Sequence, residues 1–523
     1  MNGLRYALVL GALAIGAAPA AAQEWRLFGS NEITIESYEV GGEDESASPF
    51  RFEGTFLTNR LDFGLARVDD LGRRIVLRGE LLGTNSDYFA EEGVVVGTLA
   101  VEIEDGSAAV PYRFAAGDVD GDLSRRVLQR QVRGARVELQ PQIGRGAHSV
   151  VFVTGGGEPD WRHAFEGQLT FSGLSWLWQS EPGTTSVAAN LVDAHQDAGS
   201  RGAIPIPAVD RDQQGGSLFA ATELAGVRIE GEVAVLGGDD AAEGDDTSFY
   251  AEVTRAGEGL EWRLRFEENG AGYVPIGGPG IISNRRIGEV HARLRVGARS
   301  QLRGRAQFVE QNLEGAAPRL DTELFGLAYE GRPLAARRAF RVRLYSDLSS
   351  FESADRTTDR RFESWGLEAD DRFANFDLRG RARRSETRDD VHATANRVLT
   401  ELGFDAGRSF RRSEISGRVA IGLGWREQDR NAEYDTWSPI VEASIRRGIH
   451  SLALHLGFMD QDFVAATTDD LRYQTRRLIY SLGFGAHSLF LEAGQELRER
   501  EPGLDMRSSR VALRYRYAFE KEF

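Results

Sequence analysis

The stretch VALRYRYAFEKEF, residues 511–523, ends the chain and decides how the rest of it is interpreted. Bulky apolar side chains occupy its odd positions apart from Lys521, while arginine and glutamate occupy most of the even ones. A period of two places these two sets on opposite faces of an extended strand. A tilted strand needs about nine to eleven residues to cross a bilayer, so this one is long enough to span a membrane.

The same ending resembles the C-terminal signal strand of bacterial outer-membrane β-barrels, which closes the barrel and finishes on phenylalanine. The residues that carry the resemblance are Tyr515, Tyr517, Phe519 and Phe523. Lys521 departs from the family pattern, which usually has an apolar residue there, although a lysine can extend its amine toward the barrel rim. The resemblance implies an outer-membrane location, contact with outer-membrane lipids and insertion by the outer-membrane barrel assembly machinery.

The N-terminus predicts export. Arg5 precedes an apolar run, and the small residues Ala20 and Ala22 form a cleavage site. We therefore expect residues 1–22 to be a cleaved signal peptide and residues 23–523 to be the mature barrel protein. The chain has no cysteine, so neither a lipid-anchored N-terminal cysteine nor a disulfide framework is expected.

The composition fits a membrane barrel better than its hydropathy suggests at first. The mean hydropathy of −0.36 is that of a soluble protein, but barrel strands alternate between lipid and a polar lumen and therefore average to a similar value. Sixty glycines against fourteen prolines suit many strands joined by tight turns. The net charge of −17 argues against nucleic acid as a partner.

From Trp25 onward, alternating segments are separated by polar or glycine-rich turns, and no convincing amphipathic helix interrupts them. The predicted fold class is all-β, a transmembrane antiparallel β-barrel of about 22–26 strands, within the known range for single-chain barrels. Residues 193–216 break the rhythm and are the best candidate for a long loop or an internal boundary. An alternative stays open, in which about 16–18 barrel strands follow an N-terminal β-rich plug or periplasmic part.

Arginine concentrates on the polar faces of the later strands, and in a closed barrel these faces line the lumen. The candidate lumen-lining residues are Arg263, Arg265, Arg293, Arg295, Arg303, Arg305, Arg341, Arg343, Arg379, Arg381, Arg383, Arg514 and Arg516. A guanidinium matches carboxylate, phosphate or sulfate, and rings of arginine favour anions in pores. The alternative is that these arginines pair with lumenal acids and only fill the wall, the acids being Glu261, Glu267, Glu289 and Asp377.

Two further segments lead to expectations about loops. Residues 269–286 are rich in glycine and proline, and they either fold inward to narrow the pore or form an ordinary surface loop. Asp118, Asp120 and Asp122 alternate as in a calcium loop, but Leu123 stands where an EF-hand requires glycine. We therefore expect a solvated turn there.

No catalytic constellation is found in the sequence. His148, His450 and His487 each directly precede a serine, but neighbours on a strand point to opposite faces and cannot act as a pair. A Walker loop, a zinc-ligand spacing and a nucleophile elbow are all missing from the sequence. No catalytic residue, cofactor or metal site is therefore expected, and the protein is not expected to be an enzyme.

The predicted function is an outer-membrane channel that passes a small or polymeric solute, anionic if the arginines set the selectivity. The alternative is a structural or secretion barrel with an N-terminal plug or passenger. A barrel enzyme is the least favoured interpretation.

Overall fold

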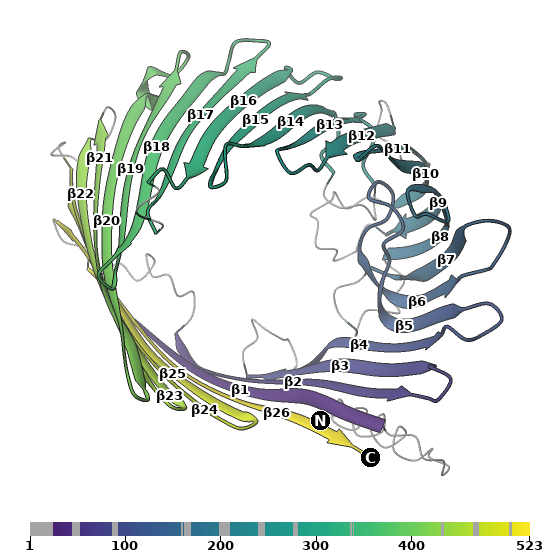
Figure 1. Cartoon of the computed structure of the whole chain (residues 1–523), viewed down its shortest axis with the longest axis horizontal. Coiled ribbons are helices and arrows are strands. Elements are labelled where there is room, and N and C mark those ends of the chain that lie inside the picture. Colours follow the sequence, from purple (N-terminus) through teal and green to yellow (C-terminus); the bar gives the residue numbers. More distant parts are fainter. Residues whose placement is uncertain are drawn as a thin grey trace.

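The chain forms a closed antiparallel barrel of 26 strands, in which each strand pairs with its neighbours in sequence and β26 pairs with β1 (Figure 1). The structure is a computed structural model. It describes residues 25–43, 53–85, 93–157, 161, 169–197, 210–238, 246–275, 281–334, 337, 339–429, 433–463, 470–501 and 505–523. Within these residues no helix is long and apolar enough to cross a membrane.

The strands are β1 Trp25–Gly42, β2 Gly54–Val68, β3 Arg74–Thr84, β4 Val94–Asp105, β5 Tyr112–Asp120, β6 Gln131–Leu139, β7 Ala147–Gly156, β8 Leu169–Gln179, β9 Thr185–Gln196, β10 Arg211–Leu224, β11 Val227–Gly237, β12 Thr247–Arg255, β13 Leu260–Asn269, β14 Arg285–Arg295, β15 Ser300–Gln311, β16 Leu320–Gly331, β17 Arg341–Ser353, β18 Asp359–Phe373, β19 Phe376–Asp389, β20 Arg397–Arg412, β21 Ile415–Asp429, β22 Tyr434–Arg447, β23 His450–Phe463, β24 Asp470–Phe484, β25 His487–Glu501 and β26 Met506–Glu522. A short 3-10 helix, η2, spans Ala393–Ala395 between β19 and β20.

The outer face of the wall is apolar and exposed, as the sequence pattern predicts. On β13, Leu260 and Leu264 are each 44% exposed, while Glu267 on the other face is buried. The same alternation runs through β14–β26, where leucine, valine and aromatic side chains lie on the exposed outer face. An apolar outer band around a polar interior is the pattern of transmembrane β-barrels, in which every backbone group is hydrogen-bonded within the closed sheet. The prediction of an all-β barrel with 22–26 strands is confirmed.

The alternative with 16–18 strands is wrong, because β1–β9 are strands of the wall and not a separate plug. Asp193 lies in β9 and Gly216 in β10, and these two strands pair directly with each other. The rest of the expected loop, residues 198–209, and the predicted signal peptide, residues 1–22, lie outside the described residues.

The seam of the barrel lies between β1 and β26, whose register runs from Arg26 paired with Glu522 to Gly42 paired with Met506. Phe523 extends the pairing, because its N–H donates to the carbonyl of Trp25 at 2.9 Å. The aromatic residues of β26 project from the outer face, and the ring of Phe519 lies against Gly29 of β1. The first and last strands of the barrel therefore meet at one line of the wall.

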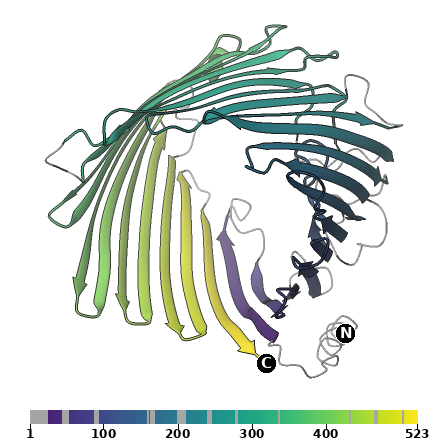
Figure 2. The same cartoon turned by 45° about the vertical axis from the view of Figure 1, so that its right-hand side comes forward.

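The wall is uneven in height. Strands β5, β6 and β12 have nine residues each, whereas β20 has 16 and β26 has 17. At about 3.3 Å per residue, the C-terminal strands are therefore roughly 20–25 Å longer. Figure 2 shows these long strands side by side, in green and yellow.

The β5–β6 hairpin leaves the wall and turns into the barrel (Figure 1). Pairing of β4 with β5 stops at Ala100 and Gly117, and β6 pairs with β7 only from Arg133 onward. Gly117 has a φ of +104°, a conformation that favours glycine. Residues 118–132, here called the inner hairpin, pack their apolar side chains on the inner faces of β7–β11.

The expectation of a solvated turn holds for Asp120 and Asp122, which are exposed, but it is wrong for Asp118. Asp118 is nearly buried, forms an ion pair with Arg133 at 3.1 Å and accepts a hydrogen bond from the N–H of Leu99 at 2.6 Å. The carboxylate thereby satisfies a donor that β4 would otherwise present to a strand of the wall. The alternating aspartates mark the point where the hairpin bends inward.

Candidate functional site

Arginine pairs lie on the inner face of β13, β15, β17 and β19, and β14 carries a further pair, Arg293 and Arg295. The first four pairs are Arg263 and Arg265 on β13, Arg303 and Arg305 on β15, Arg341 and Arg343 on β17, and Arg379 and Arg381 on β19. The intervening strands β14, β16, β18 and β20 carry carboxylates that share this face, namely Glu289, Glu330, Glu368, Asp370, Glu401 and Asp405. The antiparallel register places arginine opposite acid at several positions, such as Arg343 between Glu330 and Glu368. At β14 and β15 it instead places Arg293 opposite Arg303.

Eight of these side chains surround a hollow of about 400 Å³ between β15 and β19. They are Arg303, Glu330, Arg341, Arg343, Glu368, Asp370, Arg379 and Arg381, and we refer to them as the arginine cluster. Five guanidinium groups therefore face three carboxylates. A guanidinium remains protonated in proteins, so the cluster has an excess of two positive charges when the acids are ionised.

Ion pairs orient most of the cluster. Arg379 contacts Asp370 at 2.7 Å, and Arg343 contacts Glu368 at 3.7 Å. Arg341 lies 3.6 Å from Glu330 and 3.7 Å from Asp370. Because single acids are shared between arginines, donor N–H groups remain available on the guanidinium groups.

The arginines of the cluster extend beyond the acids. Their paired side chains are 50–63% exposed, whereas those of Glu330, Glu368 and Asp370 are 30–40% exposed. Arginine is longer than glutamate or aspartate, so its guanidinium covers the paired carboxylate and is the more exposed of the two groups. A solute approaching this part of the wall therefore meets guanidinium groups before it meets carboxylates.

Arg381 is the member of the cluster without an ion pair among the described residues, and a glycine determines its position. Its cross-strand neighbour is Gly403 on β20, where an added Cβ atom would lie 2.3 Å from Nε of Arg381. The missing side chain thus lets the guanidinium lie flat across β20. Gly326 on β16 leaves room for Arg305 in the same way, because a Cβ atom added at Gly326 would lie 2.8 Å from Nε of Arg305.

We expect Gly403→Val to weaken any anion preference of the channel without a change in formal charge, because the new side chain must push Arg381 away from the wall. The matched control is Gly380→Val, since nothing lies within 4 Å of a Cβ added at Gly380. Reversal potentials of the two variants in a salt gradient provide the measurement. Equal reversal potentials for both variants would show that the position of Arg381 is immaterial.

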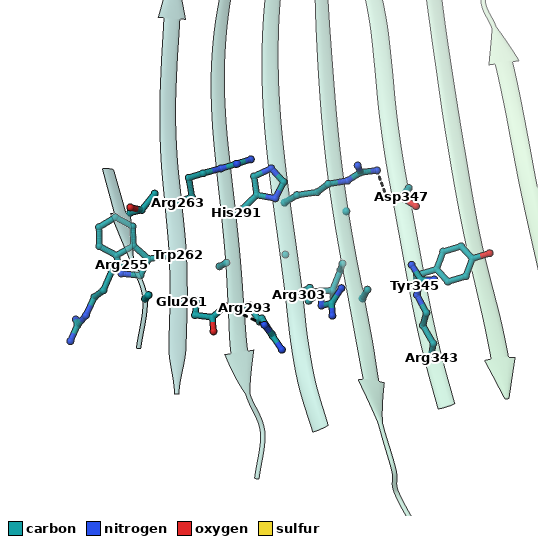
Figure 3. Close-up of a pocket in the computed structure, with 18 of the residues that line it drawn as sticks. Arg255, Glu261, Trp262, Arg263, His291, Arg293, Arg303, Arg343, Tyr345 and Asp347 are labelled. Atoms are coloured by element: carbon teal, nitrogen blue, oxygen red, sulfur yellow. Dashed lines mark hydrogen bonds and ion pairs between the residues drawn. The ribbon is translucent and has the colours of Figure 1, made fainter. Parts of the chain in front are cut away.

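A larger hollow of about 920 Å³ runs along β13–β17 beside the cluster (Figure 3). Arg305 donates to Asp347 at 3.0 Å, and Arg293 contacts Glu261 at 3.3 Å. His291 and Arg263 both contact Glu289, Arg263 at 2.8 Å. The two hollows together make one charged surface from β13 to β19.

Among the remaining sequence-predicted residues, Arg383 lines the larger hollow together with Arg303 and Arg343. Neither hollow is lined by Arg295, Arg514 or Arg516. Arg383 forms an ion pair with Glu401 at 3.8 Å, and Arg295 at the end of β14 has no ion pair among the described residues. Arg514 and Arg516 lie at the seam, where Arg514 contacts Glu32 at 3.5 Å and Arg516 donates to Ser30 at 3.4 Å. Of the four acids expected to neutralise the arginines, Glu261, Glu267 and Glu289 do so, whereas Asp377 pairs with Arg372 at 3.7 Å.

Arg126 anchors the inner hairpin, and it was missed by sequence reasoning. Its side chain is about 6% exposed, and it donates to Glu267 at 3.1 Å and to Asn269 at 3.2 Å on β13. Its guanidinium also lies over the ring of Tyr250 at 5.1 Å. These contacts fasten the tip of the hairpin to a strand 141 residues further along the chain.

The β13–β14 connection completes the anchor. The hydroxyl of Tyr273 donates to the carbonyl of Arg126 at 2.8 Å, and burial raises the pKa of this phenol, which therefore stays protonated. Of the two expectations for residues 269–286, the inward fold holds for Tyr273, which is fully buried in the core formed with the inner hairpin. Residues 276–280 lie outside the described part of the chain.

Val127 and Leu128, in the middle of a polar stretch, were the available signal for this inward packing. Both are almost completely buried, and Val127 lies against Gly215 on the inner face of β10. Leu123 lies against Gly173 of β8 in the same way.

In the described residues there is no group of three or more histidine, aspartate or glutamate side chains that could hold a metal ion.

No protein-family model and no curated protein sequence matches the chain. Among solved structures, the translocation pore of the P pilus usher PapC is similar, with 11% identity, a TM-score of 0.37, and coverage of 94% of this chain and 99% of that one. OccAB4 of Acinetobacter baumannii has 9% identity, a TM-score of 0.30, and coverage of 96% and 99%. OpdK of Pseudomonas aeruginosa has 12% identity, a TM-score of 0.30, and coverage of 60% and 94%. Similarities at this level carry no argument about what this chain does.

Proposed function

We propose that the protein is an outer-membrane channel that prefers anionic solutes and performs no covalent chemistry. The observation that carries the proposal is the arginine cluster, in which five guanidinium groups outnumber three carboxylates and extend further from the wall. Preorganised guanidinium groups attract carboxylate, phosphate and sulfate. The apolar outer band supports a location among outer-membrane lipids, which would require insertion by the barrel assembly machinery.

In this proposal all thirteen sequence-predicted arginines line the lumen, but they do not contribute equally. Arginines with a single, dedicated carboxylate, such as Arg305 with Asp347, add little net field. The excess charge lies at the cluster, where acids are shared and Arg381 has no acid of its own among the described residues. Selectivity should therefore depend mainly on β17 and β19.

The test is the reversal potential of the channel in planar bilayers under a salt gradient. Wild-type protein should prefer anions, and more strongly at low salt, because charges are screened over about 10 Å at 0.1 M and about 30 Å at 0.01 M. Replacing both Arg379 and Arg381 with glutamate should shift the reversal potential toward cation preference. Leu378→Ala, on the outer face of β19, should leave it unchanged.

A cation-preferring wild type would contradict the proposal, because it would mean that the carboxylates dominate the lumen. Absence of conductance would instead favour the alternative of a structural or secretion barrel. The observation that favours this alternative is the inner hairpin, which occupies space inside the barrel.

A further inference from the structure

The four arginine pairs on β13, β15, β17 and β19 form a track along the inner wall. Its register steps by two residues between β13 and β15, by four between β15 and β17, and not at all between β17 and β19. Neighbouring strands lie about 4.8 Å apart, so pairs on every second strand recur at about 10 Å. The strands of membrane barrels tilt by about 35–45° from the barrel axis. The steps in register displace the last pair from the first by about 20 Å along the strands. With about 29 Å across the strands, the four pairs span roughly 35 Å.

In a barrel of this size, the wall arginines affect small solutes and long chains differently. From the strand spacing and tilt, a circular barrel of 26 strands has a backbone radius of about 25 Å. Screening at physiological ionic strength confines the field of the guanidinium groups to about 8 Å. A small anion moving far from the wall is therefore scarcely affected, whereas a chain that lies along the wall can contact several arginine pairs at once.

The acids between the arginines define what else the ligand must offer. Along one cross-strand row, Glu330, Arg343, Glu368 and Arg381 alternate acceptor and donor. The matching ligand presents hydrogen-bond donors between its anionic groups, as the hydroxyls of an acidic sugar chain do. A DNA backbone has no such donors between its phosphates, and the acids of the row would repel it.

We propose that the track binds a linear acidic polysaccharide, whose acid groups contact the arginine pairs while its hydroxyls donate to the intervening carboxylates. This inference rests on the proposed function and names the substrate class of the same lumen surface. Binding should therefore depend on chain length. Each further pair reached by the same chain is bound at a high effective concentration, until the length of the track is exceeded.

The experiment measures binding, so that it does not depend on conduction. Fluorescently labelled oligogalacturonates of two to ten units are titrated onto the folded barrel in detergent, with fluorescence anisotropy as the readout. The expected Kd falls at least tenfold between the shortest chains and those that span the track, and then stays level. Oligothymidylate of equal charge should bind at least tenfold more weakly than the longest oligogalacturonate.

Two variants test the track itself, each used only if it keeps the electrophoretic shift of a folded barrel. Replacing Arg341 and Arg343 with glutamine interrupts the track and should weaken binding of long chains at least tenfold. Replacing Arg263 and Arg265 with glutamine shortens the track, so the Kd should stop falling at a shorter chain length than in the wild type. Arg477→Gln, on the same face of β24 and outside the track, is the control and should change nothing.

Affinity that is independent of chain length, or an equal loss in the control, would overturn the inference. Tighter binding of oligothymidylate would overturn the choice of a polysaccharide. Length-independent binding by an anion-preferring channel would leave the proposed function intact, whereas cation preference would remove the proposed function by a separate measurement.

Discussion

Arg126→Ala is expected to release the inner hairpin and to make a larger conductance state dominant. Removing one partner of a buried, hydrogen-bonded ion pair costs about 3–5 kcal/mol when the remaining charge is left uncompensated. Glu267 keeps Arg265 as a second partner at 2.6 Å, so the cost here should lie below that range. A cost of about 1.4 kcal/mol already shifts the ratio of fastened to released hairpin tenfold. Single-channel recordings of wild type and variant at equal salt provide the measurement.

The matched control is Arg125→Ala, which removes the exposed neighbouring arginine of the same hairpin and should leave conductance unchanged. The absence of native cysteine allows a second test that does not weaken packing. Ser124 donates a hydrogen bond to Glu232 on β11, so cysteines at these two positions can be joined by a short bifunctional thiol reagent. The cross-link should keep the hairpin on the inner wall and the channel in its low-conductance state. Cleaving the cross-link should restore the conductance of the wild type.

If Arg126→Ala and the cross-linked protein both conduct like the wild type, the inner hairpin does not control the open cross-section. A collapse of the barrel, seen as loss of the electrophoretic shift on heating, would instead show that the hairpin is needed for folding. The cross-linked protein distinguishes a role in conductance from a role in folding, because its hairpin keeps its contacts with the inner wall.

Removing residues 511–523 is expected to abolish assembly of the barrel. The truncated chain would keep only a stub of β26, so β1 would present unpaired backbone groups to the membrane, where each costs several kcal/mol. Folded wild-type barrel should migrate anomalously on SDS gels until it is boiled, and the truncated chain should show no such species. Wild-type amounts of heat-shifted protein from the truncated chain would contradict the closed seam.

Phe523→Ala provides the graded comparison for this prediction. The backbone bonds between Phe523 and Trp25 survive the substitution, and the ring itself is 59% exposed. We therefore expect reduced but measurable assembly, because only the aromatic part of the terminal signal is lost. Complete loss with Phe523→Ala would show that recognition of the ring outweighs pairing of the strand.

The fold could be predicted because its information is local. A period of two along β13 or β26 states which side chains share a face, and the turn residues state where each strand ends. Neither depends on knowing the partner strand. The number of strands followed from counting such segments, and 26 lies at the upper end of the predicted range.

The ion pairs at the site could not be predicted in the same way, because they depend on register. The sequence placed Arg379 on a polar face, but only the pairing of β18 with β19 brings it to Asp370. Whether the arginines are neutralised or left in excess is decided by which acids are shared, as Glu330 is between Arg303 and Arg341. Spacing along one strand contains no information of this kind.

The inward packing of the inner hairpin was missed because its charges dominated the local composition. Asp118, Asp120 and Asp122 suggested solvent, whereas Val127 and Leu128 determine where the segment lies. Its fastening depends on Glu267, a residue on a distant strand. The repeated glycines Gly117 and Gly134, where the hairpin leaves the wall, were the remaining clue.

Closing the seam between β1 and β26 has an entropic cost, because it joins the two ends of a long chain. Joining its two ends costs roughly 5 kcal/mol of chain entropy for a loop of about 500 residues, and no single neighbouring hairpin offsets that cost. A slip of one residue would turn Arg514 to the lipid and Leu513 to the interior, while Arg510 with Glu36 and Arg514 with Glu32 reward only the correct alignment. These two ion pairs thus act as a check on the alignment of β1 and β26 when the ring closes.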